Sequence, residues 1–205
     1  MEDDEENENE LPEIKSIILG EAGVGKSNLL NAAVDLRFEE NTKSTVAAWY
    51  VQKRMKIFNK DYQVKLWDTA GQEKYRSFTK LFYLDSKVVI FVYDITNKKS
   101  FTELDYWINQ IKEALGDEPV MGIVGNKNDL IDKKEVDEDI AKKYAEDKGM
   151  KLKLLSVKDD PKNFKIFLRM LVKDYLIKTE KIEDRNTCEI DNETNENNHG
   201  SCGTF

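Results

Sequence analysis

Short apolar runs separated by polar, turn-forming residues predict a series of buried strands along the chain. Four such runs stand at residues 14–19, 87–93, 120–125 and 151–155. Two more runs, 55–58 and 63–67, flank the polar residues 59–61 and predict an antiparallel hairpin. The strand candidates are therefore spread over most of the chain, with room for a helix between many of them.

Apolar residues at spacings of three and four predict helices in those intervals. A first helix is expected over 27–36, and Ser100 with Glu103 has the spacing of a capping box that starts another. A long stripe predicts a final, core-facing helix rather than a partner-binding surface: Phe164, Phe167, Leu168, Leu171, Val172, Tyr175 and Leu176. The alternation predicts a doubly wound, mostly parallel six-stranded α/β sheet with one antiparallel edge strand. In such a sheet the ligand lies at the C-terminal ends of the strands.

Composition predicts one compact domain between two acidic ends. The chain has 205 residues, of which 40% are hydrophobic, enough for one sizeable core. Residues 1–10 hold seven acidic side chains and no basic one, while 179–205 hold seven acidic and two basic. The net charge of -8 therefore comes from the ends, and the part between them is mildly basic. We expect an acidic, disordered extension over 1–12, a folded domain over 13–178 and a disordered tail over 179–205.

Several classes of protein are disfavoured by the same composition. No apolar run reaches membrane-spanning length, and the N-terminus lacks the basic and hydrophobic regions of a signal peptide. The two cysteines lie in the tail and predict no disulfide framework, which fits a reducing cytosol. No basic face is clustered as nucleic-acid binding requires, and the single histidine, His199, lies in the tail. We expect no nucleic-acid partner and no histidine-dependent catalysis.

A phosphate-binding loop is the strongest chemical signal in the chain. Residues 20–27 read Gly-Glu-Ala-Gly-Val-Gly-Lys-Ser, a glycine, four free positions, then Gly-Lys-Ser, placed between a predicted strand and a predicted helix. Backbone N–H groups in such a loop turn toward phosphate oxygens, and the helix N-terminus adds partial positive charge. Lys26 then reaches the β- and γ-phosphates, and the Ser27 hydroxyl is a hard oxygen ligand suited to Mg²⁺. A nucleoside triphosphate is the predicted ligand.

A second motif indicates which base is bound. The strand candidate 120–125 ends in Asn126-Lys127-Asn128-Asp129. Guanine presents an N1–H and an exocyclic amine that one carboxylate accepts together, and adenine offers no such pair on that edge, so Asp129 is the predicted reader of guanine. Asn126 is expected to brace neighbouring loops, and the Lys127 stem to lie across the base.

These segments resemble the Ras superfamily of small GTPases, and residues 67–77 resemble its Rab branch most. Tyr93-Asp94-Ile95-Thr96, Ser100-Phe101 and Trp107 are further Rab-like marks. The resemblance covers roughly residues 13–178 and implies a P-loop NTPase fold of the small G-domain type. It also implies GTP or GDP as ligand, contacted by Ala22, Gly23, Val24, Gly25, Lys26, Ser27, Asn28, Phe38, Thr45, Asp68, Gly71, Asn126, Lys127, Asp129, Ser156, Val157 and Lys158.

The resemblance assigns a role to several of these residues. Thr45 matches the threonine that ligates Mg²⁺ beside Ser27, and Asp68 the residue that holds a metal-bound water. Gly71 matches the γ-phosphate sensor. Gln72 matches the residue that orients the attacking water, which makes it and Lys26 the expected catalytic residues. Phe38 matches the aromatic that packs on guanine, and Ser156-Val157-Lys158 the turn that holds the base.

Departures from the Rab pattern concern partners rather than nucleotide chemistry. A Rab commonly has Ile-Gly-Val, an acidic residue and Phe after the switch threonine, whereas residues 46–50 read Val-Ala-Ala-Trp-Tyr. The bulky Trp49 therefore replaces an acidic side chain on the strand that faces partners. The aromatic effector triad of the family is still matched by Tyr50, Trp67 and Phe82. The chain resembles a divergent Rab.

The last four residues, Cys202-Gly203-Thr204-Phe205, place a cysteine where prenyltransferases read one, and a final Phe favours a geranylgeranyl group. A cysteine without such a role is the alternative. Rabs more often end in two closely spaced cysteines, so one lipid is expected here. A prenyl anchor predicts residence in the cytosol and on the cytoplasmic face of intracellular membranes.

The leading hypothesis is a monomeric GTP/GDP switch that acts in vesicle trafficking and hydrolyses GTP slowly with Mg²⁺ as cofactor. The resemblance implies an exchange factor, a GTPase-activating protein, effectors and a lipid-sheltering chaperone of the GDI type as partners. Two alternatives stay open: a P-loop ATPase, which Asp129 disfavours, and a nucleotide-locked scaffold, which the retained Lys26, Ser27 and Gln72 disfavour.

Overall fold

The computed structural model describes residues 11–38, 49–68 and 83–180. The strands in these ranges are β1 (Glu13–Leu19), β2 (Trp49–Ile57), β3 (Lys60–Asp68), β4 (Val88–Asp94), β5 (Val120–Asn126) and β6 (Lys151–Leu154). The helices are α1 (Lys26–Ala33), α3 (Lys98–Thr102), α4 (Leu104–Leu115), α5 (Glu138–Asp147) and α6 (Pro161–Glu180), with the 3-10 turn η2 (Ile131–Lys133). None of these helices is both long and apolar enough to cross a membrane.

The strands form one six-stranded sheet in the order β2-β3-β1-β4-β5-β6. β2 is antiparallel to β3, and every other neighbouring pair is parallel, which confirms the predicted fold class. β1 lies between β3 and β4, and the chain places β2 and β3 on one side of β1 before it continues with β4, β5 and β6 on the other. The C-terminal end of β1 is therefore the topological switch point at which ligands bind in doubly wound sheets.

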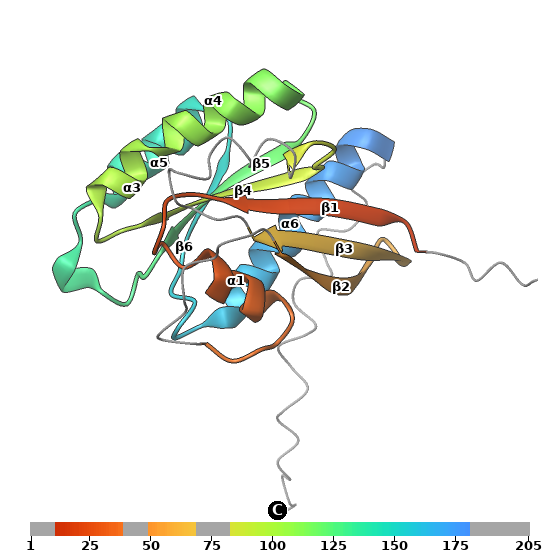
Figure 1. The fold of residues 1–205 in the computed structure, drawn as a ribbon, viewed down its shortest axis with the longest axis horizontal. Helices are drawn as coiled ribbons and strands as arrows, with labels where there is room; N and C mark the ends of the chain where they lie inside the picture. The colour runs from red at the N-terminus through yellow and green to blue at the C-terminus, as the bar shows by residue number, and fades with distance from the viewer. Residues whose placement is uncertain (1–10, 39–48, 69–82, 181–205) are drawn as a thin grey trace, which may run out of the picture.

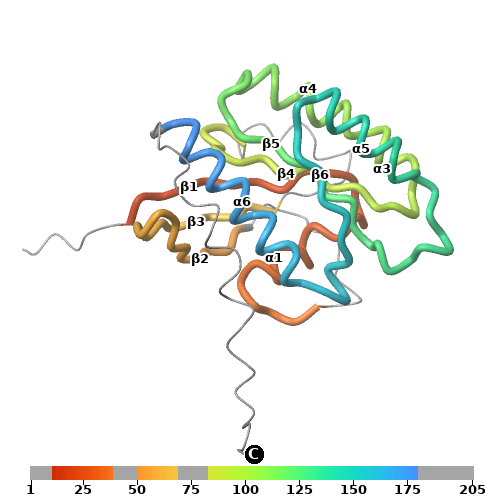
Figure 2. Tube along the Cα trace, turned by 180° about the vertical axis from the view of Figure 1, so that it is seen from behind, coloured from red at the N-terminus to blue at the C-terminus, as the bar shows by residue number. Residues whose placement is uncertain are grey.

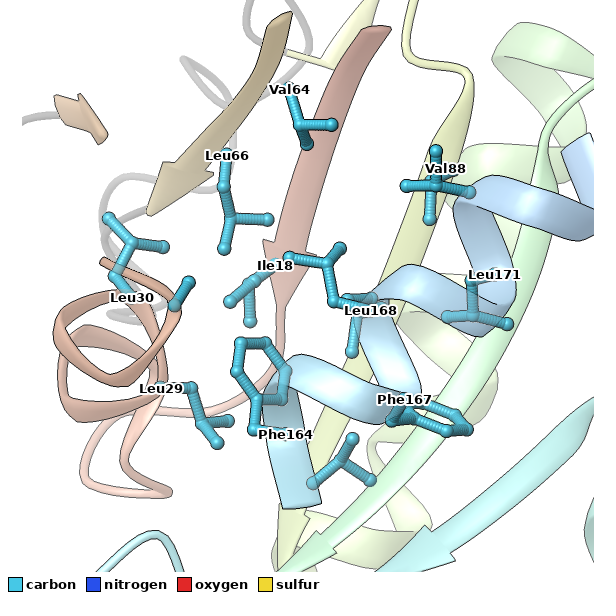
Figure 3. Packing of buried hydrophobic residues seen from close by; sticks show 14 of the residues in the cluster. Ile18, Leu29, Leu30, Val64, Leu66, Val88, Phe164, Phe167, Leu168 and Leu171 are labelled. Carbon is cyan, nitrogen blue, oxygen red and sulfur yellow. The ribbon is translucent and has the colours of Figure 1, made fainter. Parts of the chain in front are cut away.

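Helices cover both faces of the sheet (Figures 1 and 2). α1 and α6 lie together on one face, while α3, α4 and α5 lie on the other. Alternate residues of β1 divide between the two cores, with Ile14 and Ile18 facing α1 and α6, and Ile17 and Leu19 facing α4 and α5. Figure 3 shows Phe164, Phe167, Leu168 and Leu171 of α6 packed against the sheet and α1. The stripe that predicted a core-facing final helix is confirmed.

Two boundaries differ from the sequence prediction for reasons of turn chemistry. α1 ends at Ala33 because Asp35 adopts a left-handed φ of 63° and closes a Schellman motif, in which Leu36 N–H donates to Asn31 O at 2.9 Å. The hairpin turn is two residues long, because Phe58 and Asn59 both have positive φ, as a type I′ turn requires. β2 and β3 are therefore longer than the apolar runs that predicted them.

Two helix predictions need correction. Ser100 does not start a helix, since it lies inside α3, whose N-cap Asn97 accepts the Ser100 N–H. The capping box predicted from Ser100 and Glu103 is thus wrong, and α4 begins one residue after Glu103. α5 was not predicted at all. Its N-cap Asp137 accepts two backbone N–H groups, and the helix buries only two alanines, which give no apolar stripe to detect.

Candidate functional site

The loop between β1 and α1 passes so close to neighbouring strands that it requires glycine. A Cβ atom on Gly20 would lie 2.2 Å from the Val92 carbonyl oxygen of β4, and one on Gly25 would lie 2.4 Å from the Asn126 Nδ2 atom. Gly25 also has a left-handed φ of 98° and caps α1 without a side-chain hydrogen bond. Because glycine has no side chain, the N-cap residue offers no competing acceptor to the first N–H groups of α1, which suits an anion site at a helix N-terminus.

Lys26 is held inside this loop. Its ammonium donates to the carbonyl oxygens of Gly20 at 2.9 Å and Glu21 at 2.8 Å, and the residue is only 6% exposed. Burial lowers the pKa of Lys26 from 10.5 to about 8, while the carboxylates of Asp68 and Glu21 act in the opposite direction. A buried cation beside exposed loop backbone at Ala22 and Gly23 suits a strongly anionic ligand such as a phosphate chain.

Ser27 and Asp68 bring two hard oxygen atoms together beside the loop. Asp68 ends β3 and is in register with Ile18 of β1, so its side chain lies next to the start of α1. The Ser27 Oγ atom donates to Asp68 Oδ2 at 2.5 Å, and Asp68 is fully buried. A hydroxyl and a carboxylate at one point fit Mg²⁺, which prefers oxygen ligands and retains several waters.

Asn126 joins three segments that are far apart along the chain. Its Nδ2 atom donates to the Val24 carbonyl oxygen of the phosphate loop at 2.9 Å. Its Oδ1 atom accepts the Val157 N–H at 3.2 Å. The side chain thus holds the phosphate loop, the end of β5 and the turn at 156–158 side by side, as the sequence predicted for a bracing asparagine.

The residues expected to contact the base lie at that same end of the sheet. Lys127 has a left-handed φ of 64°, and its ammonium lies 2.6 Å from the Asp94 Oδ2 atom. Asp129 and Lys158 are exposed, while Val157 is buried and Ser156 half-buried. The Asn128 N–H donates to the Leu155 carbonyl oxygen at 3.1 Å, which ties the two turns together.

The structure brings most of the predicted nucleotide residues to one edge. Those it places around the C-terminal ends of β1, β3 and β5 are Ala22, Gly23, Val24, Gly25, Lys26, Ser27, Asn28, Asp68, Asn126, Lys127, Asp129, Ser156, Val157 and Lys158. Phe38 is 38% exposed at the limit of the first described range. Thr45, Gly71, Gln72, Phe82 and Cys202 lie outside the described residues.

Asp94 is a site residue to which the sequence analysis assigned no role. Asp94 belongs to Tyr93-Asp94-Ile95-Thr96, one of the segments that resemble the Rab branch. In the structure its carboxylate lies against the Lys127 ammonium. The signal available in the sequence was its position at the end of a buried strand that adjoins the strand before Asn126.

Two of the three predicted effector aromatics, Tyr50 and Trp67, meet across the two strands of the hairpin. Tyr50 and Trp67 are register partners in β2 and β3, and their ring centroids lie 4.6 Å apart. The ammonium of Lys65 lies over the Tyr50 ring and that of Lys15 over the Trp67 ring, at 5.9 and 5.5 Å from the centroids. Tyr50 is 43% exposed, whereas Trp67 is half-buried and packs against the core on the side of α4 and α5.

A separate pocket of about 280 Å³ lies at the opposite end of the sheet, among the C-terminal ends of α4, α5 and α6. Several lysines line it, but Lys178 donates to the carbonyl oxygens of Asp117 and Glu118, and Lys151 pairs with Asp174. Cations at helix C-termini offset the partial negative charge of the helix end. The lysines of this pocket therefore have a structural explanation, apart from the site at the phosphate loop.

Comparison with known proteins agrees with the geometry. The family model "Ras family" matches residues 15–176. The chain is 40% identical to Rab-21 of Geodia cydonium over 154 residues, which are 75% of this chain and 67% of the relative. It is 38% identical to human Rab-22A over 66% of this chain and 70% of the relative. Human Rab-31 is 39% identical over 68% of this chain and 71% of its own length.

Proposed function

This chain belongs to the Ras family and is a Rab-like small GTPase, and from that premise we propose how its residues divide the work of one nucleotide site. Proteins of this class bind GTP, hydrolyse it to GDP and phosphate, and act as switches in membrane trafficking. The observation that carries the assignment is the meeting of buried Lys26, the Ser27–Asp68 pair and the bracing Asn126 at the topological switch point.

We propose that the phosphate chain lies in the loop 20–27, with the Lys26 ammonium exchanging its backbone carbonyls for the β- and γ-phosphate oxygens. Ser27 and Thr45 would ligate Mg²⁺ directly, and Asp68 would do so through a water. The bound ion would neutralise part of the phosphate charge. The short Ser27–Asp68 contact supports this donor set, because both side chains already point to one place.

We propose that guanine lies between the loop at 126–129 and the turn at 156–158. Asp129 would accept its two donors, the Lys127 stem and Phe38 would lie on the faces of the base, and Ser156, Val157 and Lys158 would close the pocket edge. The hydrogen bonds that hold these two segments together support the assignment.

Nucleotide selectivity tests the base assignment. We expect Asp129→Asn to lose the acceptor pair for guanine and to gain an amide donor for the 2-carbonyl of xanthine, so its preference shifts from GTP toward XTP. Calorimetry on nucleotide-free protein measures both affinities, with Asp132→Asn, an exposed acidic residue of η2, as the matched control that should keep GTP. An unchanged preference in Asp129→Asn would contradict the assignment, and tight ATP binding by the wild type would favour a P-loop ATPase.

We propose that Gln72 orients the attacking water and that Thr45 and Gly71 sense the γ-phosphate, so that hydrolysis releases two switch segments. Unaided hydrolysis should proceed at roughly 10⁻⁴ to 10⁻³ s⁻¹, as for Ras-type GTPases that await an arginine from a partner. Gln72→Leu should bind GTP with unchanged affinity and hydrolyse it much more slowly in single-turnover assays. Equal rates for the variant and the wild type would remove Gln72 from the mechanism, and a wild type that hydrolyses no GTP would favour a nucleotide-locked scaffold.

Membership of the Rab group carries with it a general set of partners: exchange factors, activating proteins, effectors and lipid-sheltering chaperones of the GDI type. We propose that effectors contact Tyr50 and Trp67, together with Phe82, because the first two form a ring pair whose Tyr50 member is exposed. We further propose that residues 13–178 act as a monomeric G domain between the acidic segments 1–12 and 179–205. Cys202 would carry the lipid that places the chain on the cytoplasmic face of intracellular membranes.

A further inference from the structure

Both carboxylate oxygens of Asp94 are engaged at the end of β4. Oδ2 lies 2.6 Å from the Lys127 ammonium. Oδ1 accepts the Thr96 N–H at 2.8 Å and the Thr96 hydroxyl at 2.7 Å. Asp94 is 6% exposed, so its charge is largely removed from water and depends on these three donors.

The backbone fixes where this carboxylate lies. Asp94 and Asn126 are register partners in the parallel pair β4–β5, and the Ile95 N–H donates to the Asn126 carbonyl oxygen at 3.1 Å. The Asp94 N–H in turn donates to the Ser100 hydroxyl at 3.0 Å. Asp94 therefore stands directly beside the residue that precedes Lys127, and it is held there by main-chain contacts that do not involve Lys127.

Lys127 gains a defined direction from this contact. A lysine side chain has four rotatable bonds and many rotamers. The Lys127 side chain is 34% exposed, so packing alone does not restrict it to one rotamer. The left-handed backbone at Lys127 and the ion pair at its tip constrain both ends of the stem. The methylene groups between these two ends form a short apolar surface beside the loop at 126–129.

We propose that Asp94 is a positioning residue for the bound nucleotide: it holds the Lys127 ammonium so that the Lys127 stem is a preformed platform for the guanine base. This inference rests on the proposed function, since it presupposes a guanine nucleotide between 126–129 and 156–158. Preorganisation lowers the entropy that binding would otherwise lose, and it acts mainly on the rate of release. Asp94 thus slows nucleotide dissociation without touching the ligand.

The substitution Asp94→Asn separates this role from a structural one. An Asn side chain retains an oxygen for the two Thr96 donors and removes the charge that attracts Lys127. Lys127→Met retains an apolar stem and removes the ammonium. The double variant completes a cycle in which a role exercised through Lys127 must be non-additive.

The experiment measures release of a fluorescent GDP derivative from the full chain in excess Mg²⁺ and unlabelled GDP. We expect Asp94→Asn to release GDP about two- to tenfold faster, the range for one side chain losing its preorganisation. In the Lys127→Met background the same substitution should give no further acceleration. IDP, which lacks the exocyclic amine, should show the same fold-change as GDP, because a platform under the ring does not read that amine.

Three results would overturn the inference: no acceleration in Asp94→Asn, equal acceleration in both backgrounds, or an effect on GDP that IDP does not share. Should Asp94→Asn fail to fold, Lys127→Arg and Lys127→Met decide the matter, because only the arginine retains a cation for Asp94. Lys127→Arg must then release GDP more slowly than Lys127→Met, and equal rates would contradict the proposal. A wild-type chain that retains no fluorescent GDP would refute the proposed function itself.

Discussion

Lys26 is a buried charge, which is unfavourable for folding, and it is also the cation that we propose pairs with the phosphate chain. Its ammonium is almost fully buried, and two backbone carbonyls supply the hydrogen bonds that water would otherwise give. Burial lowers its pKa to about 8, and the carboxylates of Asp68 and Glu21 are the charged groups that oppose the shift. A cation in this environment is prepared for phosphate, which offers a stronger partner than a neutral carbonyl.

Nucleotide binding should therefore depend on pH in alkaline solution. The pKa of Lys26 in the folded chain, about 8, lies below its ordinary value of 10.5, so the nucleotide-free site gives up this proton as pH rises through 8. Only the charged form pairs well with phosphate, so GDP affinity should be about tenfold weaker at pH 9 than at pH 7, with proton uptake on binding. Calorimetry in buffers of different ionisation enthalpy measures both effects.

Lys26→Arg is the matched control for that titration, because a guanidinium stays charged throughout the range. Its GDP affinity should lose most of the pH dependence, even if the affinity itself is weaker. Identical pH profiles for the arginine variant and the wild type would assign the effect to another group.

At this scale the sequence predicts residues whose chemistry is tied to spacing. Lys26, Ser27 and Asp129 stand in motifs where one kind of side chain is required at one position, and the structure places all three at the C-terminal end of the sheet. The role of Asp94 could not be predicted in this way. Its partner Lys127 follows the neighbouring strand β5 and turns toward it through a left-handed backbone, which residue types do not reveal.

Helix α6 illustrates how a pattern of residues becomes an element. Its stripe at spacings of three and four predicted one buried face, and the structure buries Phe164, Phe167 and Leu168 against α1 and the sheet. Helix α5 escaped prediction because alanines at Ala141 and Ala145 bury little apolar area. Periodicity predicts helices that bury large side chains and overlooks those that pack closely through small ones.

Two substitutions on α6 test whether that face stabilises the domain. Leu168 is fully buried and Ile166 is 60% exposed two positions earlier. Leu168→Ala should lower the free energy of unfolding by about 2–5 kcal/mol, because it removes buried methyl groups and leaves a cavity. Ile166→Ala should change it by less than ~0.5 kcal/mol. Denaturant titration of the GDP-bound chain measures both, and similar losses for the two would contradict the orientation of α6.

The whole molecule assembles its site from segments that only the topology brings together. The phosphate loop follows β1, Asp68 ends β3, Asp94 ends β4 and Asn126 ends β5, and these strands are neighbours in the sheet. The alternation of strand and helix candidates predicted a doubly wound, mostly parallel sheet with one antiparallel edge strand, whereas the order of the strands comes from the structure. The contacts across that edge, such as Asn126 with Val24, depend on side-chain directions that only the structure supplies.

Charge distribution over the whole chain leads to the last prediction, which concerns Cys202. Residues 179–205 carry seven acidic and two basic side chains, so the segment before the proposed lipid is repelled by an anionic leaflet, where each Lys or Arg would instead gain about 1 kcal/mol. A single lipid anchor gives marginal, reversible binding on its own. Prenylated protein should therefore float with neutral liposomes better than with strongly anionic ones at low salt. The difference should shrink as salt screens the repulsion.

Cys202→Ser should not float with either kind of liposome, while Cys188→Ser, the matched control in the same segment, should float like the wild type. Mass spectrometry that finds no lipid on Cys202 after expression with prenyltransferases, or flotation that survives Cys202→Ser, would show that this cysteine is not the anchor.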